Sequence, residues 1–153
     1  MTQLTGATLH LEDLAVGQRF ESRAHTIDRE QIVAFARAYD PQPFHLSDEG
    51  AAGSIFETLA ASGWHTMALT MRLMVESVPF ADGLIGASTE VVWPTPTRPG
   101  MALRVFTEII DVRPSRSKPG LGIVTMRSET RDQSGTIVQI FTVKAPVFKR
   151  KRD

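Results

Sequence analysis

Two side chains that could move protons lie close together in a stretch rich in proline. Asp40 and His45 are five residues apart, and Pro41 and Pro43 stand between them. Proline disfavours helical geometry at the residue before it, so residues 40–46 are predicted to form a stiff loop. Five extended residues span up to ~17 Å, so only a curled loop would let both groups reach one water molecule. Such a pair could supply the base and the acid for adding water to an activated C=C bond.

Other groupings of reactive side chains do not fit a known kind of site. Ser62 could complete a triad with His45 and Asp40, but the sequence has no Gly-x-Ser-x-Gly elbow. His10 and His25 lack partners at metal-ligand spacing, and the chain has no cysteine, so no metal site is predicted. A dinucleotide fingerprint with three glycines is also absent, and no redox cofactor is expected.

The elements that must position this pair can be predicted from the residue pattern around it. A helix is expected over residues 28–39, because Asp28 is a good N-cap, Gln31 has capping-box spacing and apolar residues recur at helical intervals. A second, short helix is expected at residues 47–53. Residues 63–77 are apolar around most of the helix circumference, so this helix should lie inside the fold.

A sheet is predicted to surround the apolar helix. Segments rich in β-branched residues and separated by turn residues predict strands at 18–26, 84–93, 101–112, 122–132 and 136–148. Alternation in the last strand places Gln139, Phe141 and Val143 on one face, and Val138 should lie opposite. One early strand, a long helix and four consecutive strands indicate an α+β fold, with an antiparallel sheet curled around a central helix.

The sequence resembles the MaoC-like acyl dehydratase family, which includes the (R)-specific enoyl-CoA hydratases. The resemblance covers roughly residues 11–148. It rests on Tyr39-Asp40-Pro41-Gln42-Pro43-Phe44-His45-Leu46, on Phe56, and on Ala61-Ser62-Gly63-Trp64-His65-Thr66. It implies the hot-dog fold, catalytic roles for Asp40 and His45, and contact between the Gly63 N–H group and the thioester oxygen. Free N–H groups at the start of a helix suit that contact.

The chain departs from the family pattern on either side of the aspartate. The family usually has glycine before this aspartate and asparagine after it, whereas Tyr39 and Gln42 stand here. Gln42 keeps an amide that could orient a neighbour, but its longer side chain changes the shape of the pocket. Gln42, Ser62 and Gly63 are the residues expected to bind substrate.

The resemblance implies a hydro-lyase acting on a 2-enoyl or 3-hydroxyacyl thioester carried by coenzyme A, without a metal or redox cofactor. His45 is expected to be the main water-activating base, with Asp40 holding the same water, and the acyl chain should run along the central helix. A homodimer or higher homo-oligomer is expected, because subunits of the family pair through their sheets. Two alternatives remain open: a thioesterase using Asp48 or Glu49, and a non-catalytic subunit that binds thioesters.

Composition limits the partners that the chain could have. The 153 residues are 42% apolar, enough for the core of one domain over residues 1–153. Seventeen basic and seventeen acidic side chains cancel, so neither nucleic acid nor an anionic membrane is an expected partner. No apolar window reaches the ~20 residues of a membrane span. A cytoplasmic location is therefore expected, and the absence of cysteine is compatible with it.

Overall fold

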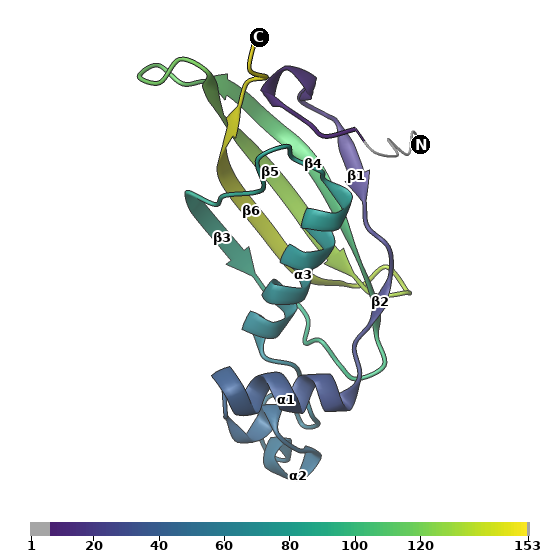
Figure 1. Cartoon of the computed structure of the whole chain (residues 1–153). Coiled ribbons are helices and arrows are strands. Elements are labelled where there is room, and N and C mark those ends of the chain that lie inside the picture. The colour runs from purple at the N-terminus through teal and green to yellow at the C-terminus, as the bar shows by residue number, and fades with distance from the viewer. Residues whose placement is uncertain (1–6, 153) are drawn as a thin grey trace.

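One long helix, α3 (Gly63–Ser77), lies against one face of a curled antiparallel sheet (Figure 1). The computed structural model describes residues 7–152; the predicted domain range 1–153 also includes residues 1–6 and 153, which lie outside the described residues. The other elements are η1 (Leu11–Asp13), β1 (Arg19–Glu21), β2 (His25–Thr26), α1 (Arg29–Tyr39), η2 (Pro43–His45), α2 (Asp48–Ala51), β3 (Ser88–Val92), β4 (Ala102–Pro114), β5 (Leu121–Arg131) and β6 (Ile137–Phe148).

The sheet has the order β1-β4-β5-β6-β3, and β2 also pairs with β4. All of these pairings are antiparallel. Alternate residues of the three long strands β4, β5 and β6 are buried and contribute to one hydrophobic core with α3. The predicted α+β class and hot-dog arrangement are confirmed, with the helix in the predicted place.

The strand predictions were wrong in three details. The strand predicted at 84–93 is shorter, because residues 84–87 lie outside β3 (Ser88–Val92). The predicted strand at 18–26 is broken into β1 and β2, because the Ser22 side chain takes part in the pairing with β4. The Ser22 N–H donates to the Val105 carbonyl, and the Val105 N–H donates to the Ser22 Oγ, each at 2.9 Å. In β6, Val138 was expected opposite Gln139, yet both are fully buried. A shift in the β5–β6 register between Thr130 and Arg131 interrupts the strict alternation.

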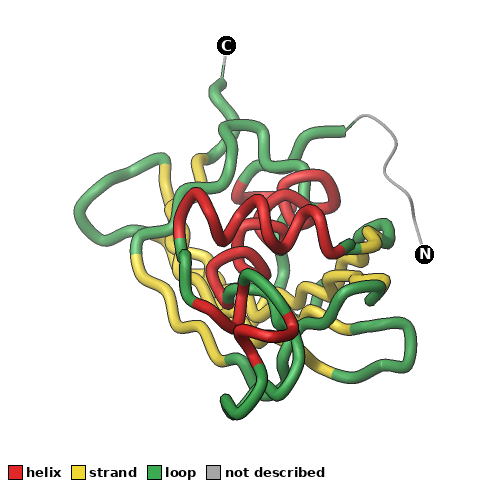
Figure 2. Tube along the Cα trace, turned by 90° about the horizontal axis from the view of Figure 1, so that it is seen from below, coloured by secondary structure: helices red, strands yellow, loops and turns green. Residues whose placement is uncertain are grey.

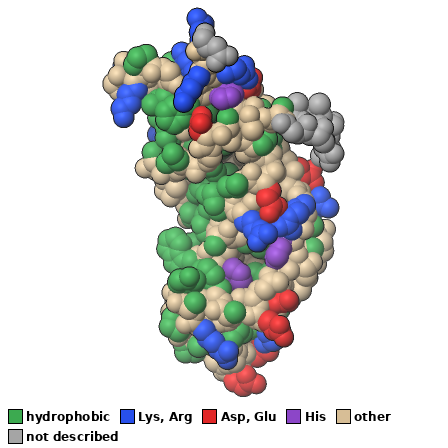
Figure 3. All heavy atoms as spheres, viewed as in Figure 1, with side chains coloured by type: hydrophobic (Ala, Val, Ile, Leu, Met, Phe, Trp, Pro, Cys, Tyr) green, Lys and Arg blue, Asp and Glu red, His purple; other side chains and the backbone are tan. Residues whose placement is uncertain are grey.

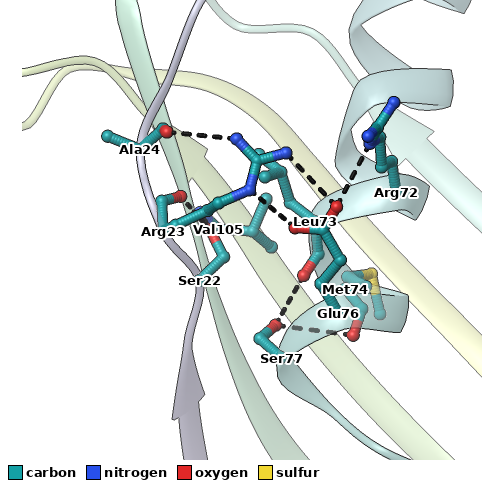
Figure 4. Close-up of polar contacts among 9 residues, drawn as sticks. All are labelled: Ser22, Arg23, Ala24, Arg72, Leu73, Met74, Glu76, Ser77 and Val105. Carbon is teal, nitrogen blue, oxygen red and sulfur yellow. Dashed lines mark hydrogen bonds and ion pairs between the residues drawn. The ribbon is translucent and has the colours of Figure 1, made fainter.

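The C-terminal half of α3 is tied to the chain between β1 and β2 (Figure 4). The Arg23 guanidinium donates to both carboxylate oxygens of Glu76, at 2.7 and 3.2 Å. Arg72, one turn earlier on α3, donates to the same carboxylate at 3.1 Å. These groups are partly exposed to solvent, so the ion pairs orient the helix more than they stabilise the fold.

The helical elements α1, η2 and α2 gather around the N-terminal end of α3, whereas η1 lies at the opposite end of the molecule, near the C-terminal end of the chain (Figures 1 and 2). Asp28 caps α1 as predicted, because its side chain accepts from the Gln31 N–H at 2.8 Å. Ser47 caps α2 by accepting from the Gly50 N–H at 2.9 Å. Among the described residues, every helix is too short or too polar to cross a bilayer.

Candidate active site

The proline-rich loop curls so that the predicted pair faces each other. Asp40 is the C-cap of α1, and its N–H donates to the Ala36 carbonyl at 2.9 Å. Pro43 then starts the single turn η2, which ends at His45. His45 Nε2 lies 3.4 Å from Asp40 Oδ2. The predicted curl of the loop is therefore confirmed, and it depends on a helix end followed at once by a tight turn.

His45 is buried and its ring is fixed. Its Nδ1 lies 2.6 Å from the Ala60 carbonyl oxygen. A carbonyl can only accept, so Nδ1 carries the proton and donates. Nε2 of the neutral ring is then an acceptor directed toward Asp40. The Phe44 ring packs edge-on against the imidazole at 4.6 Å between centroids, and Phe56 packs at 5.8 Å, which leaves the ring little freedom to turn.

Both oxygens of Asp40 accept hydrogen bonds from neighbouring side chains. Gln42 Nε2 donates to Oδ1 at 2.6 Å, and Ser62 Oγ donates to Oδ2 at 2.7 Å. Burial raises the pKa of Asp40, but the bonds from Gln42 and Ser62 lower it, as does His45 whenever its imidazole is protonated, with a net shift below the ordinary 3.8. Asp40 is therefore a carboxylate at neutral pH.

Of the three residues predicted to bind substrate, Gln42 and Gly63 line a cavity and Ser62 does not. Gln42 lines the cavity described below but also bonds Asp40. Ser62 is fully buried, bonds Asp40, and caps α3 by accepting from the Trp64 N–H at 3.2 Å. Gly63 is the first residue of α3 and lines the cavity. Within residues 7–152, no hydrogen-bond acceptor is found for the Gly63 N–H.

A cavity of about 510 Å³ adjoins the pair, a size typical of small-molecule sites. From α3 it is lined by Gly63, Trp64 and Thr66, so it adjoins the first turn of the central helix. The cavity is lined by Asp40, Gln42, Phe44, His45, Ile55, Phe56, Ala61, Gly63, Trp64, Thr66, Trp93, Pro94, Thr95, Pro96 and Thr97.

The sequence analysis missed the wall formed by residues 93–97. Pro94 and Pro96 indicate a rigid connection after a strand, and nothing in the local sequence pattern indicates that this connection faces the site. Arg98 holds this wall to the opposite side of the cavity mouth, because its guanidinium donates to the carbonyls of Phe56 and Thr58, each at 2.7 Å. A single arginine in a turn carries no sequence signal for that role.

Four other polar residues near the pair lie outside the cavity lining: His65, Asp48, Glu49 and Ser62. His65 stacks on Phe35 of α1 at 4.7 Å between centroids, and burial lowers its pKa. Asp48 accepts from the Leu59 N–H and pairs with Arg29, each at 2.9 Å, so it supports the loop rather than the pocket. Glu49 lies on the same short helix, and neither acidic residue lines the cavity. Ser62 bonds Asp40 rather than His45, which is not the order of a nucleophilic triad.

Comparisons with known proteins agree with this fold. The MaoC like domain family matches residues 13–131. A 3-hydroxybutyryl-CoA dehydratase from Methylorubrum extorquens is 31% identical over 114 residues, which cover 74% of this chain and 71% of that protein. The crystal structure of the MaoC-like dehydratase from Rhodospirillum rubrum is 54% identical and superimposes with a TM-score of 0.92, covering 94% of this chain and 99% of that one.

More distant structures share the fold. The (R)-hydratase from A. caviae involved in PHA biosynthesis superimposes with a TM-score of 0.70 at 24% identity, covering 91% of this chain and 99% of that one. Since the family match spans most of the chain and the solved Rhodospirillum protein shares more than half of its residues, this chain belongs to the MaoC-like dehydratase family.

Proposed function

We propose that this protein is a hydro-lyase that adds water to a 2-enoyl thioester, or removes it from a 3-hydroxyacyl thioester, with coenzyme A as the carrier. The observation that carries the proposal is the 3.4 Å approach of His45 Nε2 and Asp40 Oδ2 at the edge of the cavity. Both atoms are acceptors when the imidazole is neutral and the carboxylate ionised. A water molecule that donates one hydrogen to each would satisfy both.

In the proposed reaction the pair makes two proton transfers and ends in its starting state. In hydration, His45 Nε2 takes a proton from the water while the water oxygen bonds to the β-carbon. A proton is then delivered to the α-carbon from the same pair, so atoms and charge balance. Asp40 holds the water and stabilises the imidazolium, which is the role of an ionised carboxylate beside a histidine base.

The thioester oxygen gains negative charge as the β-carbon is attacked, and it needs a donor. We propose the Gly63 N–H for this role, because it lies at the cavity wall and at the positive end of a fifteen-residue helix. Gln42 and Ser62 then act through Asp40, by keeping its carboxylate ionised and oriented.

The relatives favour the same reaction class. The Methylorubrum relative is named a 3-hydroxybutyryl-CoA dehydratase, and the A. caviae structure is an (R)-hydratase. The thioesterase alternative has less support, because Asp48 and Glu49 lie outside the cavity lining.

A panel of 2-enoyl-CoA thioesters tests the proposal. We expect loss of the conjugated chromophore on addition of enzyme and formation of the (R)-3-hydroxyacyl product, identified by chiral chromatography. Release of free thiol would instead identify a thioesterase. Binding of the thioesters without either product would identify a non-catalytic subunit.

We also propose that the protein is a homodimer that pairs through β3. This strand is an edge of the sheet and bonds only β6 among the described strands. Figure 3 shows hydrophobic side chains gathered on the side of the molecule where β3 and α3 lie. The large exposed ones in these elements and directly after β3 are Trp64, Val75, Val92 and Trp93. A second copy would cover this surface and supply partners for the free strand edge.

A further inference from the structure

A chain of hydrogen-bonded side chains fills the space between α3 and the sheet, and Trp93, at one end of this chain, lines the cavity. Trp93 Nε1 donates to Gln139 Oε1 at 2.9 Å, and Gln139 Nε2 donates to Thr70 Oγ1 at 2.9 Å. Thr70 and Thr130 share a further bond of 2.7 Å. We call these four residues the end wall. Gln139, Thr70 and Thr130 are fully buried.

Hydrogen bonds between buried polar groups fix the side chains of the end wall. A buried amide that loses a hydrogen-bond partner is strongly unfavourable. The Gln139 amide oxygen accepts from the Trp93 indole N–H, and the Gln139 amide nitrogen donates to the Thr70 hydroxyl. Trp93 therefore cannot swing away from the cavity without leaving the Gln139 oxygen unpaired in the core.

Packing at the start of α3 holds the same indole from a second side. A Cβ atom built on Gly63 would lie 2.7–2.9 Å from three atoms of the Trp93 ring, so only glycine allows this approach. The Trp64 ring meets Trp93 edge-on at 5.5 Å between centroids. Trp93 is still 41% exposed, so one edge of the ring faces outward while the N–H points inward.

We infer that the end wall restricts the acyl group to short chains and that Trp93 is the specificity-determining residue. This inference rests on the proposed function and adds to it the class of substrate. Thr66 is the last residue of α3 that lines the cavity, and its hydroxyl donates to Thr97 Oγ1 at 2.9 Å, so the end wall lies where an acyl chain would continue along α3. A longer acyl chain would have to displace the indole.

The test measures kcat/KM for crotonyl-, hexenoyl-, octenoyl- and decenoyl-CoA. We expect the native protein to lose ~10-fold or more between crotonyl- and octenoyl-CoA, since a closed pocket discriminates by about this much against added methylene groups. Trp93→Ala should raise the octenoyl-to-crotonyl ratio ~10-fold or more. Gln139→Leu keeps the volume but frees the indole, so the ratio should rise by a smaller factor. Trp93→Phe, which keeps a ring without the N–H donor, is a milder variant should Trp93→Ala not fold.

Ile109→Val is the matched control, because Ile109 is a fully buried core residue of β4 outside the cavity lining. It should lower stability without changing the ratio. An equal change of the ratio in this control would mean that Trp93 acts only through general stability, and would overturn the inference.

A second measurement separates this inference from the proposed function. Calorimetry of saturated butanoyl- and octanoyl-CoA measures length discrimination without turnover. Tighter binding of butanoyl-CoA by the native protein, reversed or abolished in Trp93→Ala, supports the end wall even if no enoyl-CoA is hydrated. Turnover of crotonyl- and octenoyl-CoA at equal efficiency by the native protein, or an unchanged ratio in folded Trp93 and Gln139 variants, would overturn the inference while leaving the proposed hydratase intact.

Discussion

At the scale of single residues, different neighbours determine the protonation state of His45 and of Asp40. The Ala60 carbonyl determines which nitrogen of His45 carries the proton, and Gln42 and Ser62 keep Asp40 ionised. None of these partners adds or removes a proton in the proposed reaction. They prepare two acceptors that face one position, which is the arrangement a shared water requires.

Removal of either proton-transfer group should abolish most of the turnover. Asp40→Asn and His45→Ala are each expected to lose ~10²-fold or more in kcat, as found for positioned acid–base groups. Steady-state kinetics on crotonyl-CoA, with circular dichroism to verify folding, checks this. Glu49→Ala is the control, because Glu49 lies outside the cavity lining and should leave kcat unchanged. If both folded variants of the pair kept native rates, the assignment would be wrong.

Loss of the Ser62 hydroxyl should raise the pKa of Asp40. Ser62 lowers that pKa by donating to Oδ2, so in Ser62→Ala the carboxyl should titrate at higher pH, as measured by NMR of the Asp40 carboxyl carbon. The folded pKa lies below the ordinary 3.8, so ionised Asp40 also stabilises the fold at neutral pH, and this contribution is lost as pH falls through the folded pKa. Ser62→Ala should therefore also reduce stability above that range.

Ser47→Ala separates the effect on Asp40 from the loss of a helix cap. Ser47 caps α2 as Ser62 caps α3, but it bonds Gly50 and not Asp40. Each variant should lose about 0.5–2 kcal/mol from its cap. Only Ser62→Ala should raise the pKa of Asp40, and an equal rise in both variants would contradict the proposed role of the hydroxyl.

At the scale of elements, the short helix α2 supports the turn that carries His45. A Cβ atom on Gly50 would overlap the Pro43 carbonyl oxygen and lie 2.8 Å from its carbon. Glycine is therefore required where α2 packs on η2. The contact is between two backbones, so neither can yield without moving its whole turn.

Gly50→Ala should displace η2 and with it His45. We expect a loss of about 1–3 kcal/mol in the free energy of unfolding, typical of overpacking, and a fall in kcat beyond what instability explains. Thermal unfolding and kinetics below the transition measure the two effects. Glu49→Ala, on the same helix, should show neither. A Gly50→Ala protein with native stability and rate would refute the support assigned to this contact.

The elements that the sequence predicted best are those with a strong local signal. The cap at Asp28 and the apolar run at 63–77 indicated both helices that bound the site. The curl around Asp40 and His45 followed from two prolines and from the resemblance to the family. The wall at 93–97 and the tie made by Arg98 could not be predicted, because they depend on loops that meet only in the folded chain. Burial of Val138 depended on a register shift that strict alternation cannot anticipate.

At the scale of the whole molecule, charged side chains and exposed apolar side chains lie on different parts of the surface. The outward face of the sheet carries compensated ion pairs, such as Glu129 between Arg127 and Arg131. Apolar side chains are exposed instead along α3 and β3. A protein with balanced charge and one apolar side is suited to pairing with its own copy.

A charge placed on β3 should separate the two copies. Val92 is 45% exposed on this strand, so Val92→Glu should convert the proposed dimer into a monomer in sedimentation velocity experiments. Ile110→Glu is the control, because Ile110 is 42% exposed on β4, an interior strand of the sheet. A native protein that sediments as a monomer, or a Val92→Glu variant that remains dimeric, would contradict pairing through β3.

The strand β3 ends at Val92, and the next residue is Trp93. The segment that would meet a neighbouring copy is thus joined by one peptide bond to the side chain that closes the cavity. If two copies pair through β3 as proposed, a mutation that alters their association will tend to reposition this indole, so quaternary structure and substrate range are expected to change together in descendants of this protein. Engineering a wider substrate range through Gln139, which bonds the indole from the interior, should therefore change assembly as well.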